Sequence, residues 1–113
     1  MLKNALDSAL NEWKDKPITF VGYGGVGGAR AIEQLRLNAI ELQMTPLKKA
    51  VHIGLEPFLG VLMQGKALDD YPYLPPARTA MFEQLVWYAR ALATARALTA
   101  ERAATTILAS IAD

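Results

Sequence analysis

Hydrophobic positions recur along the chain with two periods, and they predict helices alternating with short strands. Apolar residues return every three or four positions over residues 2–13, which is typical of an amphipathic helix. Pro17 stops this helix, and the apolar, partly β-branched run at residues 17–21 predicts a strand covered on both faces. A glycine-rich loop at residues 22–28 then leads into a second amphipathic helix, from residue 29 to about residue 43.

The second half of the chain repeats the change from strand to helix. Residues 47–53 predict a second strand, residues 56–64 a short helix, and residues 65–76 an irregular, proline-rich connector. From Ala77 onward no glycine or proline interrupts the chain, which predicts a long helix to about Leu98 and a separate or frayed helical tail beyond it. A strand, a helical crossover and a second strand form a βαβ unit with a parallel pair. Two strands are fewer than most open sheets contain, so the fold class is α/β and the pattern is half of a doubly wound sheet.

Composition narrows the function classes. The chain has 113 residues, enough for one domain, and 12 Lys and Arg against 11 Asp and Glu give a net charge of +1. This balance leaves no excess of basic residues of the kind that binds nucleic acid or an anionic membrane. Without cysteine and with one histidine, a disulfide scaffold or a zinc site is not expected. No apolar stretch reaches the ~20 residues of a membrane helix, and Asp7 and Glu12 argue against a signal peptide, so we expect a cytoplasmic protein.

The glycine loop allows more than one interpretation. Residues 22–27 satisfy G-x-G-x-x-G between a strand and a helix, as a dinucleotide site would, because glycines let the backbone approach a pyrophosphate. That fingerprint also needs an acidic residue about 20 positions later; Glu56 comes too late, and Lys48 and Lys49 stand at the beginning of the next strand. The alternative is a tight turn that needs glycines for its backbone geometry alone.

Three further side chains are candidates for chemistry, and each also has a structural interpretation. His52 lies at the buried end of the second strand, where we expect a packed core residue rather than a base or ligand. Asp69 and Asp70 could act as paired carboxylates, but adjacent residues in a proline-rich connector favour a solvated turn. The sequence therefore nominates no catalytic residue and no metal ligand.

A set of motifs, taken together, resembles the C-terminal half of NAD(P)H-dependent FMN reductases with a flavodoxin-like fold. The resemblance runs from Leu2 to about Leu98. The matching positions are Leu2-Lys3-Asn4-Ala5-Leu6-Asp7, Trp13, Lys16-Pro17, Tyr23-Gly24-Gly25, Gly27-Gly28, Arg30-Ala31, Glu33-Gln34-Leu35-Arg36 and Pro46.

The resemblance implies a partial flavodoxin-like parallel sheet in which residues 18–21 and 47–53 are the family's strands four and five. It implies FMN as cofactor, NADPH as a transient reductant, and Gly22, Tyr23, Gly24 and Gly25 as cofactor-binding residues at the carboxyl end of strand four. The family's phosphate-binding loop and its Pro-x-Tyr-Asn segment both precede the LKNALD helix, so we expect the N-terminal half of the fold to be absent from this chain. Gly22 and Gly27 also stand where many members carry serine.

Three functions follow from these observations. The first is an NAD(P)H-dependent FMN or quinone oxidoreductase, present as a truncated half, with a fold segment over residues 1–98 and a helical tail over residues 99–113. The second is a non-catalytic remnant or interaction domain that oligomerises, and the third is a small dinucleotide-binding βαβ domain. Because two strands cannot cover the apolar helix faces and leave a strand edge unpaired, we expect a homo-oligomer, either a dimer or a tetramer, with no nucleic-acid or membrane partner.

Overall fold

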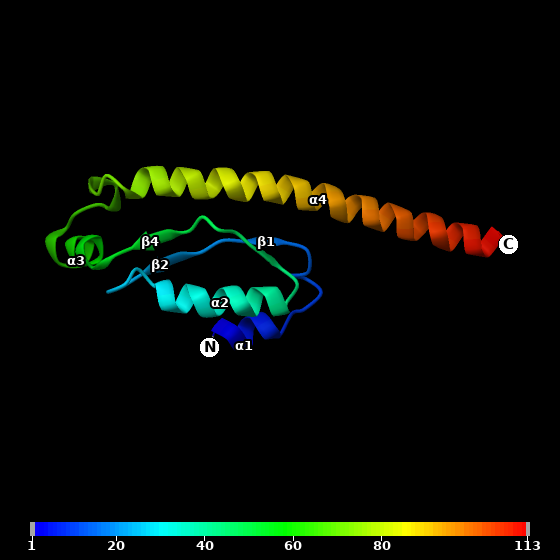
Figure 1. Cartoon of the computed structure of the whole chain (residues 1–113), viewed down its shortest axis with the longest axis horizontal. Helices are drawn as coiled ribbons and strands as arrows, with labels where there is room; N and C mark the ends of the chain where they lie inside the picture. Colours follow the sequence, from blue (N-terminus) through cyan, green and yellow to red (C-terminus); the bar gives the residue numbers. More distant parts are fainter. Residues whose placement is uncertain (1, 113) are drawn as a thin grey trace.

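The first predicted strand, at residues 17–21, forms as two short pieces. The second, predicted over residues 47–53, is a strand only at residues 51–53, and a separate two-residue piece precedes it at residues 45–46. The computed structural model describes residues 2–112. Position 1 of the predicted fold segment and position 113 of the predicted helical tail lie outside the described residues. Strand β1 (Pro17–Ile18) pairs with β3 (Thr45–Pro46), and β2 (Val21–Tyr23) pairs with β4 (Val51–Ile53), both in parallel. Helix α2 (Ala29–Glu41) connects them as the crossover of the predicted βαβ unit (Figure 1).

A two-residue bulge separates the two paired pieces. Pro17 is in register with Thr45, whereas Val21 is in register with Val51, so the second strand has two extra residues between the pairings. The backbone groups of the bulge that have no partner in the other strand form hydrogen bonds with side chains. Thr19 Oγ1 donates to the Lys49 carbonyl at 2.7 Å. Three other bonds hold the bulge, and they come from distant parts of the chain. The Arg36 guanidinium donates to the Leu47 and Lys48 carbonyls, and the Lys49 N–H donates to Gln84 Oε1 at 3.0 Å.

The helices form layers on the two faces of the strands. Helix α4 (Leu74–Ala112) crosses one face and contacts β1 and β4, while α2 covers the other face, next to α1 (Leu2–Asp7) (Figure 1). Helix α3 (Leu55–Gln64) and a short 3-10 helix (Leu68–Asp70) follow β4 at one end of the molecule (Figure 1). The core between β4 and α4 consists of Val51, Tyr71, Leu74 and Met81.

Helix α1 is shorter than its apolar pattern predicts. The prediction of a helix over residues 2–13 is wrong after Asp7, because side chains take the carbonyls that would continue it. Ser8 Oγ donates to the Ala5 carbonyl at 2.6 Å, and Trp13 Nε1 donates to the Leu6 carbonyl at 2.9 Å. The helix keeps one exposed ion pair, in which a hydrogen bond to Asp7 at 2.8 Å raises the pKa of Lys3.

Helix α4 makes the molecule elongated. It runs without interruption from Leu74 to Ala112, through the position at which the sequence allowed a separate tail, and its first turn includes Pro75 and Pro76. The radius of gyration is 19.0 Å, against about 13 Å for a compact domain of this length. The excess comes from the C-terminal part of α4, which extends beyond the strands (Figure 1).

Candidate functional site

The glycine loop begins inside β2, and three of its glycines are required by packing within the chain. A Cβ on Gly22 would lie 2.5 Å from the Gly27 carbonyl oxygen and 2.7 Å from Ile32 Cδ1. Gly27 and Gly28 have positive φ angles of 65° and 71°, and a Cβ on either would also come within 2.8 Å of its neighbours. These three positions therefore meet the expectation of a tight turn that needs glycine for geometry.

Gly24 and Gly25 differ from the other three because the space around them is open. A Cβ on either residue would meet no atom within 4 Å. Gly24 has a φ of 127°, which L side chains rarely adopt, so its backbone alone accounts for a glycine there. Gly25 has neither a positive φ nor a close neighbour, so nothing within the described chain requires glycine at that position.

The backbone donors of this segment divide into used and free groups. The Gly24 N–H donates to the Ile53 carbonyl at 3.1 Å, and the Gly27 N–H donates to the Gly24 carbonyl at 3.1 Å. Because the pleat alternates, the Tyr23 N–H points away from β4, and neither it nor the Gly25 N–H has an acceptor among the described residues. Helix α2 begins just after Gly28 and directs its positive end toward the same loop.

An aromatic pair borders the loop on the side of α3. The rings of Tyr23 and Phe58 stack with centroids 5.6 Å apart and planes at 15°, although Tyr23 remains 67% exposed. The pair lies along an apolar hollow of about 230 Å³, which Ile53, Val61 and Leu62 also line. Exposed aromatic faces beside free backbone donors form a surface on which a planar, polar-edged ligand could rest.

His52 is not the packed core residue that its position predicts. Its side chain is exposed, and Nδ1 lies 2.9 Å from the Gly27 carbonyl, so Nδ1 carries the proton and donates. The sequence misplaced it because β4 turns Val51, rather than its neighbour, toward the core. His52 therefore helps to hold the turn of the glycine loop, a role that sequence alone did not reveal.

The other candidate side chains have structural partners. Asp69 forms an exposed ion pair with Arg78 at 3.0 Å, and Asp70 Oδ2 accepts a hydrogen bond from the Ala67 N–H at 2.9 Å, as expected for a solvated turn. Lys48 and Lys49 lie in the bulge before β4, at the end of the strand away from the glycine loop. Over residues 2–112 there is no group of three or more potential metal ligands, and no helix there is long and apolar enough to cross a membrane.

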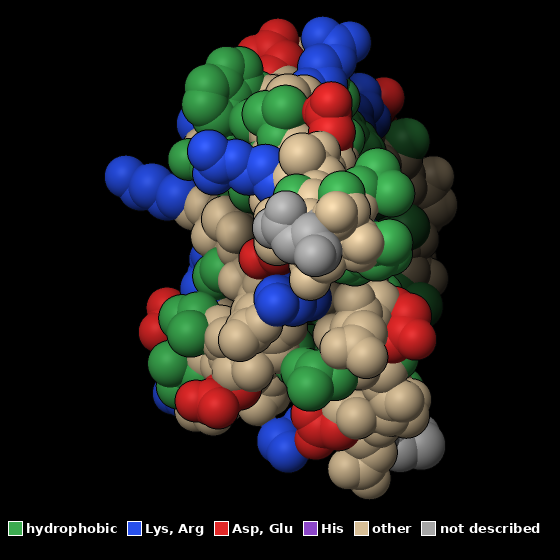
Figure 2. All heavy atoms as spheres, turned by 90° about the vertical axis from the view of Figure 1, so that its right-hand side faces the viewer, with side chains coloured by type: hydrophobic (Ala, Val, Ile, Leu, Met, Phe, Trp, Pro, Cys, Tyr) green, Lys and Arg blue, Asp and Glu red, His purple; other side chains and the backbone are tan. Residues whose placement is uncertain are grey.

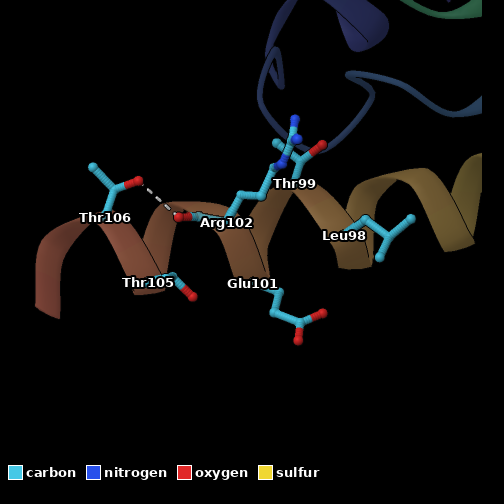
Figure 3. A pocket seen from close by; sticks show the side chains of 6 residues that line it. All are labelled: Leu98, Thr99, Glu101, Arg102, Thr105 and Thr106. Atoms are coloured by element: carbon cyan, nitrogen blue, oxygen red, sulfur yellow. Dashed lines mark hydrogen bonds between the residues drawn. The ribbon is translucent and has the colours of Figure 1, made fainter. Parts of the chain in front are cut away.

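A hollow of about 790 Å³ along α4 also lacks the features of a site. Its lining residues, from Leu98 to Thr106, all belong to one helix. The Glu101 and Arg102 side chains point to different sides of that helix (Figure 3). With no second element facing it, this hollow does not bring chemical groups together.

The opposite edge of β2 is open, and apolar hollows flank it on both faces. Phe20 and Gly24 pair with the second strand, so the pleat turns the backbone groups of Val21 toward the other side, where β2 has no neighbour among the described residues. Val21 is 58% exposed and lines a hollow of about 220 Å³ with residues of α4 and a second one of about 240 Å³ with residues of α1 and α2.

Comparisons with known proteins agree on one group of relatives. Residues 1–57 match the family described as NADPH-dependent FMN reductase. An NAD(P)H-dependent FMN reductase of Nectria sp. is 40% identical over 68 residues, which cover 60% of this chain and 33% of that protein. Reductases with the same description from Schizosaccharomyces pombe and Saccharomyces cerevisiae are 48% identical over 44 residues and 49% identical over 35 residues.

These relatives are much longer than the segments that match. The match covers 39% of this chain and 22% of the S. pombe protein, and 31% of this chain and 18% of the S. cerevisiae protein. The chain thus spans between about a fifth and a third of the length of the curated relatives it matches. No solved structure matches the chain.

Proposed function

The chain belongs to the NADPH-dependent FMN reductase family, and on that premise we propose that its glycine loop forms one wall of a flavin site in an NAD(P)H-dependent FMN or quinone oxidoreductase. The observation that carries the proposal is Gly25. Its backbone conformation is open to any residue, and a side chain there would meet no other atom of the described chain. The position is nevertheless a glycine, and its own N–H has no acceptor among the described residues. A ligand that approaches the backbone closely gives a reason for glycine at such a position.

The residues present suit one edge of an isoalloxazine ring. The free N–H groups of Tyr23 and Gly25 can donate to the acceptor atoms at the polar edge of the ring, whereas the Gly24 N–H is already used within the sheet. The Tyr23–Phe58 pair offers an aromatic surface beside them. FMN, when bound, supplies the hydride chemistry with NAD(P)H; the chain binds the ring and orients it.

We further propose that the chain is the C-terminal half of this fold and that the flavin site is complete only when the preceding half is joined to it. The open edge of β2 supports this, because a neighbouring strand would pair with the free backbone groups of Val21 and Tyr23. The alternate side chains of such a strand would enter the hollows on the two faces. The share of the relatives' length that this chain matches supports it as well.

The test is an FMN fluorescence titration of this chain mixed with, or fused to, a polypeptide carrying the preceding part of an NAD(P)H-dependent FMN reductase. We expect the assembled pair to quench FMN fluorescence and the chain alone to quench it weakly. Gly25→Val should abolish the quenching, and Ala95→Val, which places the same side chain on an exposed part of α4, should not. Equal quenching by the Gly25→Val assembly would contradict the assignment of the loop.

A second candidate function is an oligomerising domain that binds no flavin. The exposed apolar residues of α4 favour this function, because they lie far from the glycine loop and could bind another protein surface without a cofactor. An assembly that forms fully but leaves FMN fluorescence unchanged would support this second function over the first.

A further inference from the structure

The C-terminal part of α4 has no packing partner in the described chain. The last hydrogen bond that joins α4 to another part of the described chain comes from Arg96, whose Nη1 donates to the Asp15 carbonyl at 2.7 Å. All 16 residues from 97 to 112 are helical and exposed. Because a helical segment of this length gains little stability in water without an apolar face to pack, we expect another surface to cover it.

An apolar stripe follows the outer side of α4 over most of its length. At 3.6 residues per turn, the residues of this stripe fall within an arc of about 40° around the helix axis. That arc lies roughly a quarter turn or more from the buried face that carries Met81. We call this set the outer stripe; it consists of Phe82, Val86, Ala93, Ala100, Ala104 and Ile111. All six side chains are exposed, with Phe82 at 52% and Ile111 at 75%.

The stripe is bulky at its two ends and narrow in the middle. Phe82 and Val86 line an open hollow of about 540 Å³ on the first half of α4. Exposed Ile107, Leu108 and Ile111 stand at the other end, and the positions between carry alanine. A second α4 laid against the first can therefore approach closely at the alanines while its bulky end enters the hollow.

The charges beside the stripe favour an antiparallel arrangement. Arg90 and Glu101 lie equally far on either side of the point between Ala95 and Arg96, on the same flank of the stripe. A two-fold axis at that point places each Arg90 beside the partner's Glu101 and each Val86 within about one residue, ~1.5 Å in height, of the partner's Ala104. It also brings the two Arg96 residues close to the axis, where each guanidinium is held by the Asp15 carbonyl of its own chain. In a two-fold parallel pair the two flanks lie on opposite sides of the seam, and Arg90 and Glu101 are separated by about three turns along the helix, so this ion pair could not form.

The antiparallel arrangement also avoids a clash between the two molecules. The strands and other helices lie along residues 74–96 of α4, whereas the segment beyond is free (Figure 1). Reversing the partner places its free segment beside the supported half of the first helix, with the two folded bodies at opposite ends. Seen toward the C-terminal end of α4, hydrophobic, acidic and basic side chains are interspersed (Figure 2).

We propose that α4 is a dimerisation helix, and that two copies of this chain associate through antiparallel outer stripes with reciprocal Arg90–Glu101 pairs. This inference does not rest on flavin binding, because the stripe lies on the outer side of α4 and the glycine loop at the end of β2. The two proposals share one residue, Phe82, which also lines the hollow beside Val21.

Sedimentation of the full chain tests the association. We expect a dimer at micromolar concentration, and we expect Arg90→Glu to weaken it by about five- to tenfold, because two exposed ion pairs become repulsive. The double variant Arg90→Glu/Glu101→Arg should restore the wild-type affinity. Arg102→Glu makes the same charge change away from the outer stripe and should leave the affinity unchanged. A monomer at high micromolar concentration, or a dimer insensitive to Arg90→Glu, would overturn the proposal.

Because the chain has no cysteine, disulfide trapping can establish the direction of the helices. A mixture of the Val86→Cys and Ala104→Cys variants should form a mixed disulfide rapidly, and Val86→Cys alone should not. The control mixture, Ala95→Cys with Ala104→Cys, should react slowly because position 95 faces away from the stripe. Rapid self-linking of Val86→Cys would indicate a parallel pair and would also overturn the proposal.

Discussion

Replacing Gly22 by alanine should destabilise the protein strongly, whereas the same change at Gly25 should not. The two residues are three positions apart in one loop, and sequence motifs treat them alike. At Gly22 the new methyl group would lie 2.5 Å from the Gly27 carbonyl oxygen, a backbone atom, and 2.7 Å from Ile32 Cδ1. At Gly25 it would meet nothing within 4 Å.

The magnitudes follow from these contacts. Forcing an extra methyl group into a packed position costs about 1–3 kcal/mol, and Gly22→Ala belongs near 3 kcal/mol because part of what must move is backbone. Gly25→Ala restricts the unfolded chain without strain in the folded one, which stabilises by about 0.4–1 kcal/mol. The two variants should therefore differ by about 3–4 kcal/mol in the free energy of unfolding.

Urea unfolding followed by the fluorescence of half-buried Trp13 measures this difference. With a slope of about 1.5–2 kcal/mol per molar urea, the midpoints of the two variants should be about 2 M apart. Equal midpoints, or a Gly25→Ala variant less stable than Gly22→Ala, would refute the division of the loop into packing glycines and open glycines.

Three further substitutions test other parts of the fold by urea unfolding. Arg36→Lys should lower the free energy of unfolding by about 2 kcal/mol, because lysine cannot donate to both carbonyls of the bulge. Arg30→Lys, on the exposed face of α2, should not change it measurably, and equal effects of the two substitutions would contradict this role of Arg36. Gln43→Gly should stabilise by about 0.5–1 kcal/mol, because Gln43 has a φ of 60° at the end of α2; a destabilised variant would show that the side chain compensates for its backbone. Val21→Lys should change the stability of the chain by less than about 0.5 kcal/mol but prevent assembly with the preceding half of the fold; a large loss of stability would show that the edge is already covered.

The order of elements was predictable from the sequence, because it depends on local signals. The prolines, the glycine loop and the two apolar periods predicted a parallel βαβ unit followed by helices, and the structure confirms that arrangement. The short helix α3 and the long helix α4 also lie close to their predicted positions.

The bulge and the end of α1 were not predictable, because they depend on contacts between distant residues. Nothing in residues 47–50 shows that Arg36 and Gln84 will satisfy their backbone groups, so the second strand was expected to be continuous. Likewise, Trp13 fits the apolar period of a longer helix, and only its hydrogen bond to Leu6 shows that the chain turns back there.

The candidate site was predictable as a segment but not residue by residue. Resemblance placed Gly22, Tyr23, Gly24 and Gly25 together as cofactor-binding positions, and that assignment remains a prediction. The geometry distinguishes among them: Gly22 is packed within the sheet, the Gly24 N–H is already bonded, and Tyr23 and Gly25 keep free donors. Because internal packing and a positive φ explain every other glycine of the loop, an argument for a ligand depends on Gly25. The Gly25→Val titration therefore tests the function most directly, since it changes a position that folding of the chain does not constrain.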